Sequence, residues 1–330
     1  MMLPKPIASL SLDLDDKWSY LKTHGDLGWE SLPSYLEVLV PRVLAFLKAK
    51  NLTITFFIVG QDAALPKNHD LLKAIADAGH EIGNHSYHHE PWLHLYSPVQ
   101  IEAEIARAED EIGNATGQRP VGFRAPGYGL SRATLSVLAR RGYLYDASTL
   151  PNLLAPLVRK YYFKTAKFNA EQSHQRSMLG GTLRDALRPI QPYRWKMEST
   201  TLIEIPVTTM PVFRTPIHLS YLFALASISR KVGYQYFNAA LKLCSLTGTA
   251  PSLLLHPTDF LDCDDVSELC FIPGMRLPSE EKLEFVGDIL RTLSQQFIIL
   301  KLQQHAARLS ELPAVEPKFP LVTISQERLV

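Results

Sequence analysis

The sequence lacks the features that mark several classes of protein. It has three cysteines in 330 residues, Cys244, Cys263 and Cys270. They are too few for a disulfide framework and too scattered for a zinc–cysteine site, and we expect Cys263 and Cys270 to stay reduced. No apolar run approaches the roughly 18 residues that a membrane span requires. The N-terminus has no apolar segment of the signal-peptide kind, so we expect a cytoplasmic protein.

An excess of charge of one sign is also missing. The chain has 34 basic and 33 acidic residues, for a net charge of +1. This balance gives no electrostatic reason to expect a nucleic-acid partner. Hydrophobic residues make up 46% of the chain, which is enough for a sizeable core. We expect a single domain over residues 1–312 and a loosely held tail over residues 313–330.

Strand-like and helix-like segments alternate over the first 150 residues. Strands are expected at residues 6–14, 53–59, 80–84, 121–124 and 143–146. Amphipathic helices are expected between them, at residues 34–50, 68–78, 98–113 and 131–141. Alternation at this spacing predicts an α/β fold in which helices cover a parallel sheet, either open or closed into a barrel.

The second half of the chain begins with a departure from this rhythm. Residues 151–200 are rich in Arg, Lys, Tyr and Gln without a clear period. We interpret them as an insertion over the mouth of the barrel. Further strands are expected at residues 202–207, 252–256 and 297–300, and a helix at residues 279–295. The apolar residues 218–247 are expected to form two helices that break near Gly233.

A pair of histidines is the most informative local feature. His85 and His89 lie four residues apart, and in one turn of helix such residues share a face. Their imidazoles can then converge on one divalent metal. The acidic run at residues 13–16 offers the third ligand. Two histidines and one carboxylate leave coordination positions open for water, as in hydrolytic metal sites.

Three more polar residues lie at the ends of expected strands. They are Arg124, Asp146 and His256. The carboxyl ends of the strands carry the chemistry in α/β barrels, so these residues are candidates for a site. Each also has a structural interpretation. His256 could be a buried histidine, Arg124 an ordinary salt-bridge partner, and Asp146 a turn or cap residue.

Five short motifs, in the same order along the chain, resemble those of the polysaccharide deacetylase family, which carries the NodB homology domain (carbohydrate esterase family 4). They are residues 13–16 (Asp-Leu-Asp-Asp), 85–89 (His-Ser-Tyr-His-His), 124–128 (Arg-Ala-Pro-Gly-Tyr), 145–148 and 253–257. The resemblance covers roughly residues 6–150 and 200–305. It implies a distorted, seven-stranded (β/α) barrel and the metal-dependent removal of an acyl group from an amide nitrogen.

The resemblance also implies a ligand set and a base. One divalent ion, zinc first and cobalt or nickel next, would be held by an aspartate with His85 and His89. The common family pattern makes Asp15 the base and Asp16 the ligand, whereas a spaced variant makes Asp13 the base and Asp15 the ligand. Alternate residues of a strand share a face, which favours Asp13 and Asp15 provided that the strand continues that far.

The remaining motif residues receive supporting roles from the same resemblance. His256 would protonate the departing nitrogen, Arg124 would hold the base aspartate, and Asp146 would restrain the arginine. A backbone N–H near Tyr128 is a candidate oxyanion donor. Ser86 is expected to orient the histidine segment as a hydrogen-bond donor.

The substrate is less determined than the chemistry. A cytoplasmic member of the family would act on a small or lipid-linked N-acylated sugar. Residues 218–247 could rest on a membrane surface, although a pair of barrel helices is the preferred interpretation. An amidohydrolase acting on a non-sugar C–N bond and a non-catalytic glycan-binding barrel are the alternatives. The complete acid–base set argues against the second of these.

Overall fold

The computed structural model describes residues 5–155, 183–197, 201–309 and 313–315. Its strands are β1 (Ile7–Leu14), β2 (Thr55–Ile58), β3 (Glu81–Asn84), β4 (Gly122–Phe123), β5 (Tyr145–Asp146), β6 (Tyr193–Lys196), β7 (Thr201–Glu204), β8 (Ser252–Leu255), β9 (Ile298–Leu300) and β10 (Ala314–Val315). Its α-helices are α1 (Lys17–His24), α2 (Leu36–Ala49), α3 (Gly60–Ala63), α4 (His69–Asp77), α5 (Pro98–Thr116), α6 (Arg132–Arg140), α9 (Leu183–Ala186), α10 (Leu219–Ala226), α11 (Arg230–Thr247), α12 (Ser279–Gln296) and α13 (Leu302–Ala307).

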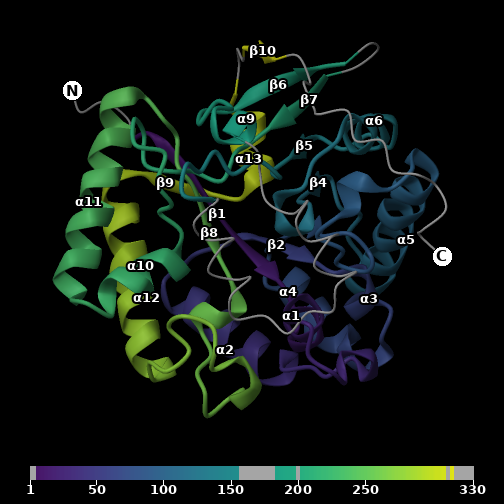
Figure 1. Cartoon of the computed structure of the whole chain (residues 1–330), viewed down its shortest axis with the longest axis horizontal. Helices are drawn as coiled ribbons and strands as arrows, with labels where there is room; N and C mark the ends of the chain where they lie inside the picture. Colours follow the sequence, from purple (N-terminus) through teal and green to yellow (C-terminus); the bar gives the residue numbers. More distant parts are fainter. Residues whose placement is uncertain (1–4, 156–182, 198–200, 310–312, 316–330) are drawn as a thin grey trace.

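The strands form one curled sheet with the order β10-β6-β7-β5-β4-β3-β2-β1-β8, and β9 pairs with β1. The strands from β8 through β1 to β5 and β7 pair in parallel, while β6 joins β7 antiparallel. The chain beyond β7 returns to β8, where the Thr208 N–H donates to the Ser252 carbonyl at 3.0 Å. Helices surround the sheet, with α11 and α12 on one side and α5 and α6 on the other (Figure 1). The expected α/β barrel-like fold is confirmed.

Strand β1 shows how the sequence produces this arrangement. Leu10 and Leu12 pack into the apolar core beneath the helices. Ser11 and Asp13 face the opposite side, where both accept hydrogen bonds from Arg124. Because neighbouring residues of a strand point to opposite faces, one strand supplies both an apolar exterior and a polar interior. The polar interior at its carboxyl end is where the candidate site lies.

The amino-terminal end of the barrel is closed by helix α13, which the sequence analysis did not predict. The buried Glu81 carboxylate accepts hydrogen bonds from the Thr55 hydroxyl (2.7 Å), the Gln303 N–H (2.9 Å) and the Tyr145 hydroxyl (2.8 Å). Burial raises the pKa of Glu81 above its usual value. These bonds tie the start of α13 to β2, β3 and β5, so this end of the barrel has a structural role.

The expected position of the break between the two helices of residues 218–247 needs correction. The break between α10 and α11 falls at residues 227–229, while Gly233 lies inside α11. A side chain at Gly233 would place its Cβ 3.2 Å from Phe285 and 3.4 Å from the Leu222 carbonyl. Glycine therefore serves the close approach of α11 to its neighbours, rather than a break.

A described part of the predicted insertion, and one of the predicted tail, take part in the sheet. Residues 156–182 and 198–200 of the insertion lie outside the described residues, but its later part forms strand β6, which lies between β7 and β10. Ala314 and Val315, at the start of the tail, pair with β6 as β10. A short strand among polar residues carries too weak a periodic signal to be predicted.

The expectation that Cys263 and Cys270 stay reduced was wrong. Cys263 and Cys270 form a disulfide, with their Cα atoms 5.4 Å apart. The segment between them turns back through a short 3-10 helix at Ser267–Leu269, which brings the two residues within bonding reach. Cys244 is free and buried. Within the described residues, none of the helices combines the length and apolar character needed to cross a membrane.

Candidate metal centre and active site

Asp15, His85 and His89 converge at the carboxyl end of the barrel. The Asp15 Oδ1 atom lies 3.3 Å from His85 Nε2 and 3.0 Å from His89 Nε2. Potential ligand atoms of the three residues all lie within 4.8 Å of one another, and all three residues are buried. Asp15 follows β1, while both histidines follow β3. The structure thus brings the three predicted ligands together from segments 70 residues apart in sequence.

The histidine segment is an irregular loop, so the expected helical turn is wrong. The backbone has positive φ at Ser86 (60°) and at His89 (50°). Such values are uncommon for residues other than glycine and carry a cost in backbone energy. The loop doubles back on itself and still brings both imidazoles to Asp15, by a route that spacing alone does not reveal.

Two residues that the sequence analysis overlooked hold this loop. The buried Glu104 carboxylate of α5 accepts hydrogen bonds from the N–H groups of Tyr87 (3.2 Å) and His88 (3.0 Å). Asn84 accepts the Ser86 N–H at 2.8 Å. The Ser86 hydroxyl is buried without a hydrogen-bond partner, so the donor role expected of it is not seen. Asn84 and Glu104 fix the loop instead.

The orientation of His85 prepares it to bind a metal. Its Nδ1 lies 2.7 Å from the Arg124 carbonyl oxygen and donates to it. The proton on Nδ1 leaves a lone pair on Nε2, which faces Asp15 Oδ1. In this neutral tautomer a lone pair faces a carboxylate oxygen at 3.3 Å, an arrangement that needs a cation, either a metal ion or a proton, between the two atoms. Two imidazole nitrogens and one carboxylate oxygen fit a divalent ion such as zinc.

Electrostatics also keeps Asp15 ionised. Burial raises the pKa of its carboxyl, but the combined effect of His89 and His85 is larger and holds the pKa well below its usual value. For His85, burial lowers the pKa, while Asp13 and Asp15 raise it by more. The ionised Asp15 supplies the negative charge that binds a cation, and a metal ion would displace the proton that the raised pKa favours on His85.

Asp16, the alternative ligand, points away from this centre. Its carboxylate accepts the N–H groups of Lys17 (2.7 Å) and Tyr35 (3.0 Å) and caps helix α1. Burial raises the pKa of Asp16 to about 6. The β1 strand ends at Leu14, before Asp15, so strand alternation alone does not place this residue, and its distances to His85 and His89 do so instead. Asp13 and Asp15 therefore share the site, and Asp16 belongs to the helix.

Asp13 is held by a buried arginine. Arg124 Nη1 donates to Asp13 Oδ1 at 2.6 Å and to the Ser11 hydroxyl at 2.9 Å, and Arg124 Nε donates to the Ala147 carbonyl at 3.0 Å. Arg124 has no exposed surface, and Asp13 is only 3% exposed. The ion pair fixes the Asp13 carboxylate near the end of β1, two residues before Asp15.

Asp146 makes no hydrogen bond to Arg124, so the expected restraint is limited to the attraction between the two charges. Tyr145 faces the barrel interior, so Asp146 points to the other side of β5, where the Ser148 hydroxyl donates to it at 2.5 Å. Arg124 instead bonds the carbonyl of Ala147. Burial raises the pKa of Asp146. Asp146 therefore supports the strand behind the arginine.

The Tyr128 N–H, the predicted oxyanion donor, is already engaged. It donates to the Ala125 carbonyl at 3.1 Å within the short 3-10 helix Pro126–Tyr128. Tyr128 also has a positive φ of 61°. In this conformation its N–H serves the turn, and the structure does not present it as a free donor to a substrate.

His256 follows β8, the strand on the other side of β1. Leu255 pairs with Leu12 at the end of the β1–β8 register, and His256 follows Leu255 as Asp13 follows Leu12. Its backbone N–H donates to Asp259 Oδ2 at 2.7 Å. Its ring packs edge-on against the His218 ring, with centroids 6.2 Å apart. The predicted base and the predicted acid thus come from adjacent strands at the same edge of the sheet.

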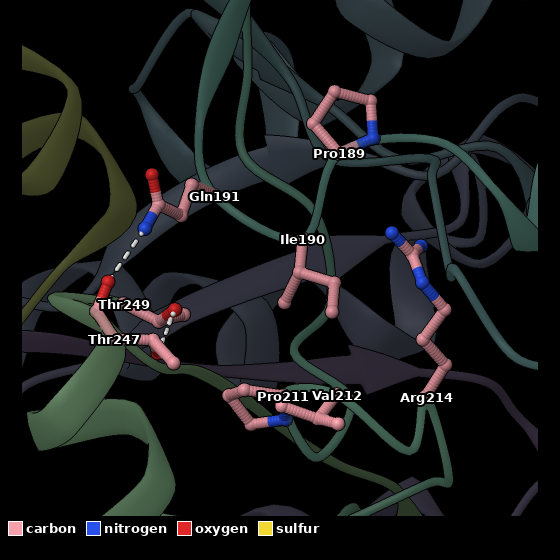
Figure 2. A pocket seen from close by; sticks show the side chains of 8 residues that line it. All are labelled: Pro189, Ile190, Gln191, Pro211, Val212, Arg214, Thr247 and Thr249. Carbon is pink, nitrogen blue, oxygen red and sulfur yellow. Dashed lines mark hydrogen bonds between the residues drawn. The ribbon is translucent and has the colours of Figure 1, made fainter.

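An open hollow of about 320 Å³ lies elsewhere, beside the end of α11 (Figure 2). It is lined by Pro189, Ile190, Gln191, Pro211, Val212, Arg214, Thr247 and Thr249. Its polar side chains already bond the protein. Gln191 donates to the Thr247 carbonyl, and Arg214 donates to two main-chain carbonyls. It contains none of the predicted site residues, so we do not assign the chemistry to it.

Replacing Arg124 by methionine is expected to lower the free energy of unfolding by about 3–5 kcal/mol, because it leaves the Asp13 carboxylate buried without a partner. The control is Arg119→Met. Arg119 bonds Glu109 at 2.9 Å with a side chain that is 54% exposed, so the expected loss is at most about 1 kcal/mol. Urea unfolding followed by circular dichroism measures both. Equal losses would show that the Arg124–Asp13 pair is not a buried, structure-determining contact.

Comparisons with known protein sequences agree with this geometry. Residues 22–145 match the family model described as polysaccharide deacetylase. The chain is 30% identical over 162 residues to a peptidoglycan deacetylase of Helicobacter pylori, an alignment that covers 47% of this chain and 53% of the relative. It is 36% identical over 104 residues to the peptidoglycan-N-acetylmuramic acid deacetylase of Bacillus subtilis, covering 31% and 38%. The chain therefore spans about half the length of the first relative, and less of the second.

Solved structures show the same fold. A Mycobacterium smegmatis protein assigned to the polysaccharide deacetylases superposes with a TM-score of 0.63 at 21% identity, covering 98% of both chains. A Puue allantoinase superposes with a TM-score of 0.57 at 18% identity, covering 93% of this chain and 94% of the other. At these identities the likeness establishes the fold alone.

Proposed function

We propose, from the match of residues 22–145 to the polysaccharide deacetylase family model, that this chain is a metal-dependent hydrolase that removes N-acetyl groups from a carbohydrate. One observation carries the proposal. The buried cluster of Asp15, His85 and His89 lies beside Asp13, which Arg124 holds in place. A hydrolytic site needs both a metal centre and a positioned base, and this edge of the barrel offers both.

The three ligand atoms would be Asp15 Oδ1, His85 Nε2 and His89 Nε2. This mixture of nitrogen and oxygen donors suits zinc best, with cobalt and nickel as alternatives. A bound divalent ion would polarise the amide carbonyl and lower the pKa of the attacking water. The Arg124 carbonyl keeps His85 in the tautomer that binds metal.

Asp13 and His256 would move the protons. Asp13 takes one proton from the water as its oxygen attacks the carbonyl carbon, and the ion pair with Arg124 keeps its carboxylate in place. His256, on the neighbouring strand, gives a proton to the nitrogen as the C–N bond breaks. The products are acetate and the free amine. Asp13 and His256 thus act as base and acid from adjacent strands of one sheet.

An N-acetylated glycan of the peptidoglycan type is the proposed substrate class, since the similar sequences are named for that activity. Lipid-linked or small N-acetylated sugars, and non-sugar C–N bonds, are the alternatives. The cytoplasmic location and the membrane contact expected from the sequence stay predictions.

Acetate release by zinc-loaded protein tests the proposal. The panel comprises N-acetylglucosamine oligomers, peptidoglycan glycan strands, a nucleotide-linked N-acetylhexosamine and a lipid-linked N-acetylated sugar, with allantoin as the non-sugar substrate. We expect acetate from the glycan substrates and no turnover of allantoin. Hydrolysis of allantoin without acetate release from any sugar would overturn the proposal and favour the amidohydrolase alternative.

A further inference from the structure

Lys282 of helix α12 ends in the protein interior, behind the turn that follows His256. Its side chain has no exposed surface. Its Nζ donates to the Thr258 carbonyl at 2.9 Å and to the Leu261 carbonyl at 2.5 Å, and lies 3.7 Å from the Met275 sulfur. An ammonium group has three N–H donors, so the protein supplies a partner for each of them.

A fully buried ammonium is unfavourable unless its surroundings compensate for the lost hydration. Burial lowers the pKa of Lys282 to about 8. The Phe223 ring lies 5.7 Å from the ammonium and adds a favourable cation–π contact. An apolar residue could fill the same space without the desolvation free energy of a buried ammonium, but it would leave the two carbonyls without donors. The lysine therefore fixes the main chain at Thr258 and Leu261.

Asp259 fixes the same turn from its other end. It is 1% exposed, and its Oδ2 accepts the His256 N–H at 2.7 Å. The Asp259 N–H in turn donates to the His256 carbonyl at 3.0 Å. Burial raises the pKa of Asp259 to about 6, although the nearby charges of His256 and Lys282 act in the opposite direction. Both main-chain polar groups of His256 are thus bonded to one residue of the turn.

We propose that Lys282 and Asp259 are positioning residues for His256, which hold the turn so that its imidazole meets the leaving nitrogen. This inference rests on the proposed deacetylase function. Both side chains are buried and bond the main chain, so they act through His256 and not on the substrate. The proposed metal ligands lie directly after β1 and in the loop after β3, on other elements. Loss of the Lys282 or Asp259 side chain should therefore impair protonation of the leaving group and leave metal binding intact.

The dependence of the rate on the leaving group distinguishes this role from a general structural one. An amine cannot leave without a proton, whereas 4-nitrophenolate leaves unaided. We expect Lys282→Met to lower kcat on the N-acetylated glycan by about tenfold to a hundredfold. Hydrolysis of 4-nitrophenyl acetate and zinc content should stay near wild type. Lys301→Met is the control. Lys301 also donates to a main-chain carbonyl, that of Gly79, but this hydrogen bond is exposed and involves no residue of the turn after His256.

Asp259 provides a second, independent pair of variants. Asp259→Ala should show the same selective loss on the glycan, and Asp259→Asn should restore most of it, since asparagine keeps an acceptor for the His256 N–H. If Lys282→Met fails to fold, Asp259→Ala and Asp259→Asn still test whether the turn positions His256. Equal losses on both substrates at full zinc content, or unchanged glycan turnover in Lys282→Met and Asp259→Ala, would overturn the inference. An inactive wild type would instead overturn the proposed function itself.

Discussion

Substitution of His85 by alanine abolishes stoichiometric zinc binding and reduces acetate release to background, if the centre is assembled as we propose. The reason is geometric. His85 Nε2 and His89 Nε2 flank one oxygen of Asp15 at 3.3 Å and 3.0 Å, and removal of one imidazole leaves only two protein ligands. Even the loss of a group that merely orients a ligand costs about 10–100-fold in metal affinity, so the loss of a ligand should cost more.

Two measurements check this result without relying on activity alone. Metal analysis after dialysis should give about one zinc per wild-type chain and none in His85→Ala. Thermal unfolding should show zinc stabilising only the wild type, by about 2.7 kcal/mol at a hundredfold excess over Kd. His69→Ala is the matched control, since His69 bonds the Ala63 carbonyl away from the centre. Full zinc occupancy in His85→Ala would contradict the ligand assignment.

Substitution of His256 by alanine should have the opposite profile, with zinc retained and turnover lost. His256 follows β8, the strand that pairs with β1, whereas the metal ligands follow β1 and β3. Removal of a proton donor typically lowers the rate by about 10²–10⁴-fold. Zinc content, measured alongside acetate release, should match the wild type. Equal loss of zinc in His85→Ala and His256→Ala would show that the division into ligands and acid is wrong.

The sequence predicted the parts of the fold that follow from side-chain periodicity. The run of apolar residues at 10, 12 and 14, interleaved with Ser9, Ser11 and Asp13, already contains both faces of β1. The choice between Asp15 and Asp16 depended on where that strand ends, which the pattern leaves open by a residue or two. In the structure the Asp16 side chain caps the next helix, which favours Asp15 as the ligand.

The parts that escaped prediction depend on contacts between distant segments. The spacing of His85 and His89 is the same in a helix and in a tight loop, and only the packing of α5 on that loop decides between them. Glu104 looks like a surface residue of an amphipathic helix, yet its carboxylate is buried and holds the loop. Lys282 is equally inconspicuous in an otherwise ordinary helix. Single charged residues carry no periodic signal that would mark them as buried.

Acetate release by metal-stripped and reloaded protein tests the central claim most directly. The substrate is an N-acetylated peptidoglycan glycan strand, and the protein is treated with a chelator, dialysed and titrated with zinc. The site of Asp15, His85 and His89 predicts that stripping removes activity and that activity returns in proportion to zinc, reaching its maximum near one ion per chain. Full acetate release by the stripped protein, or none after reloading with zinc, cobalt and nickel in turn, would contradict the account.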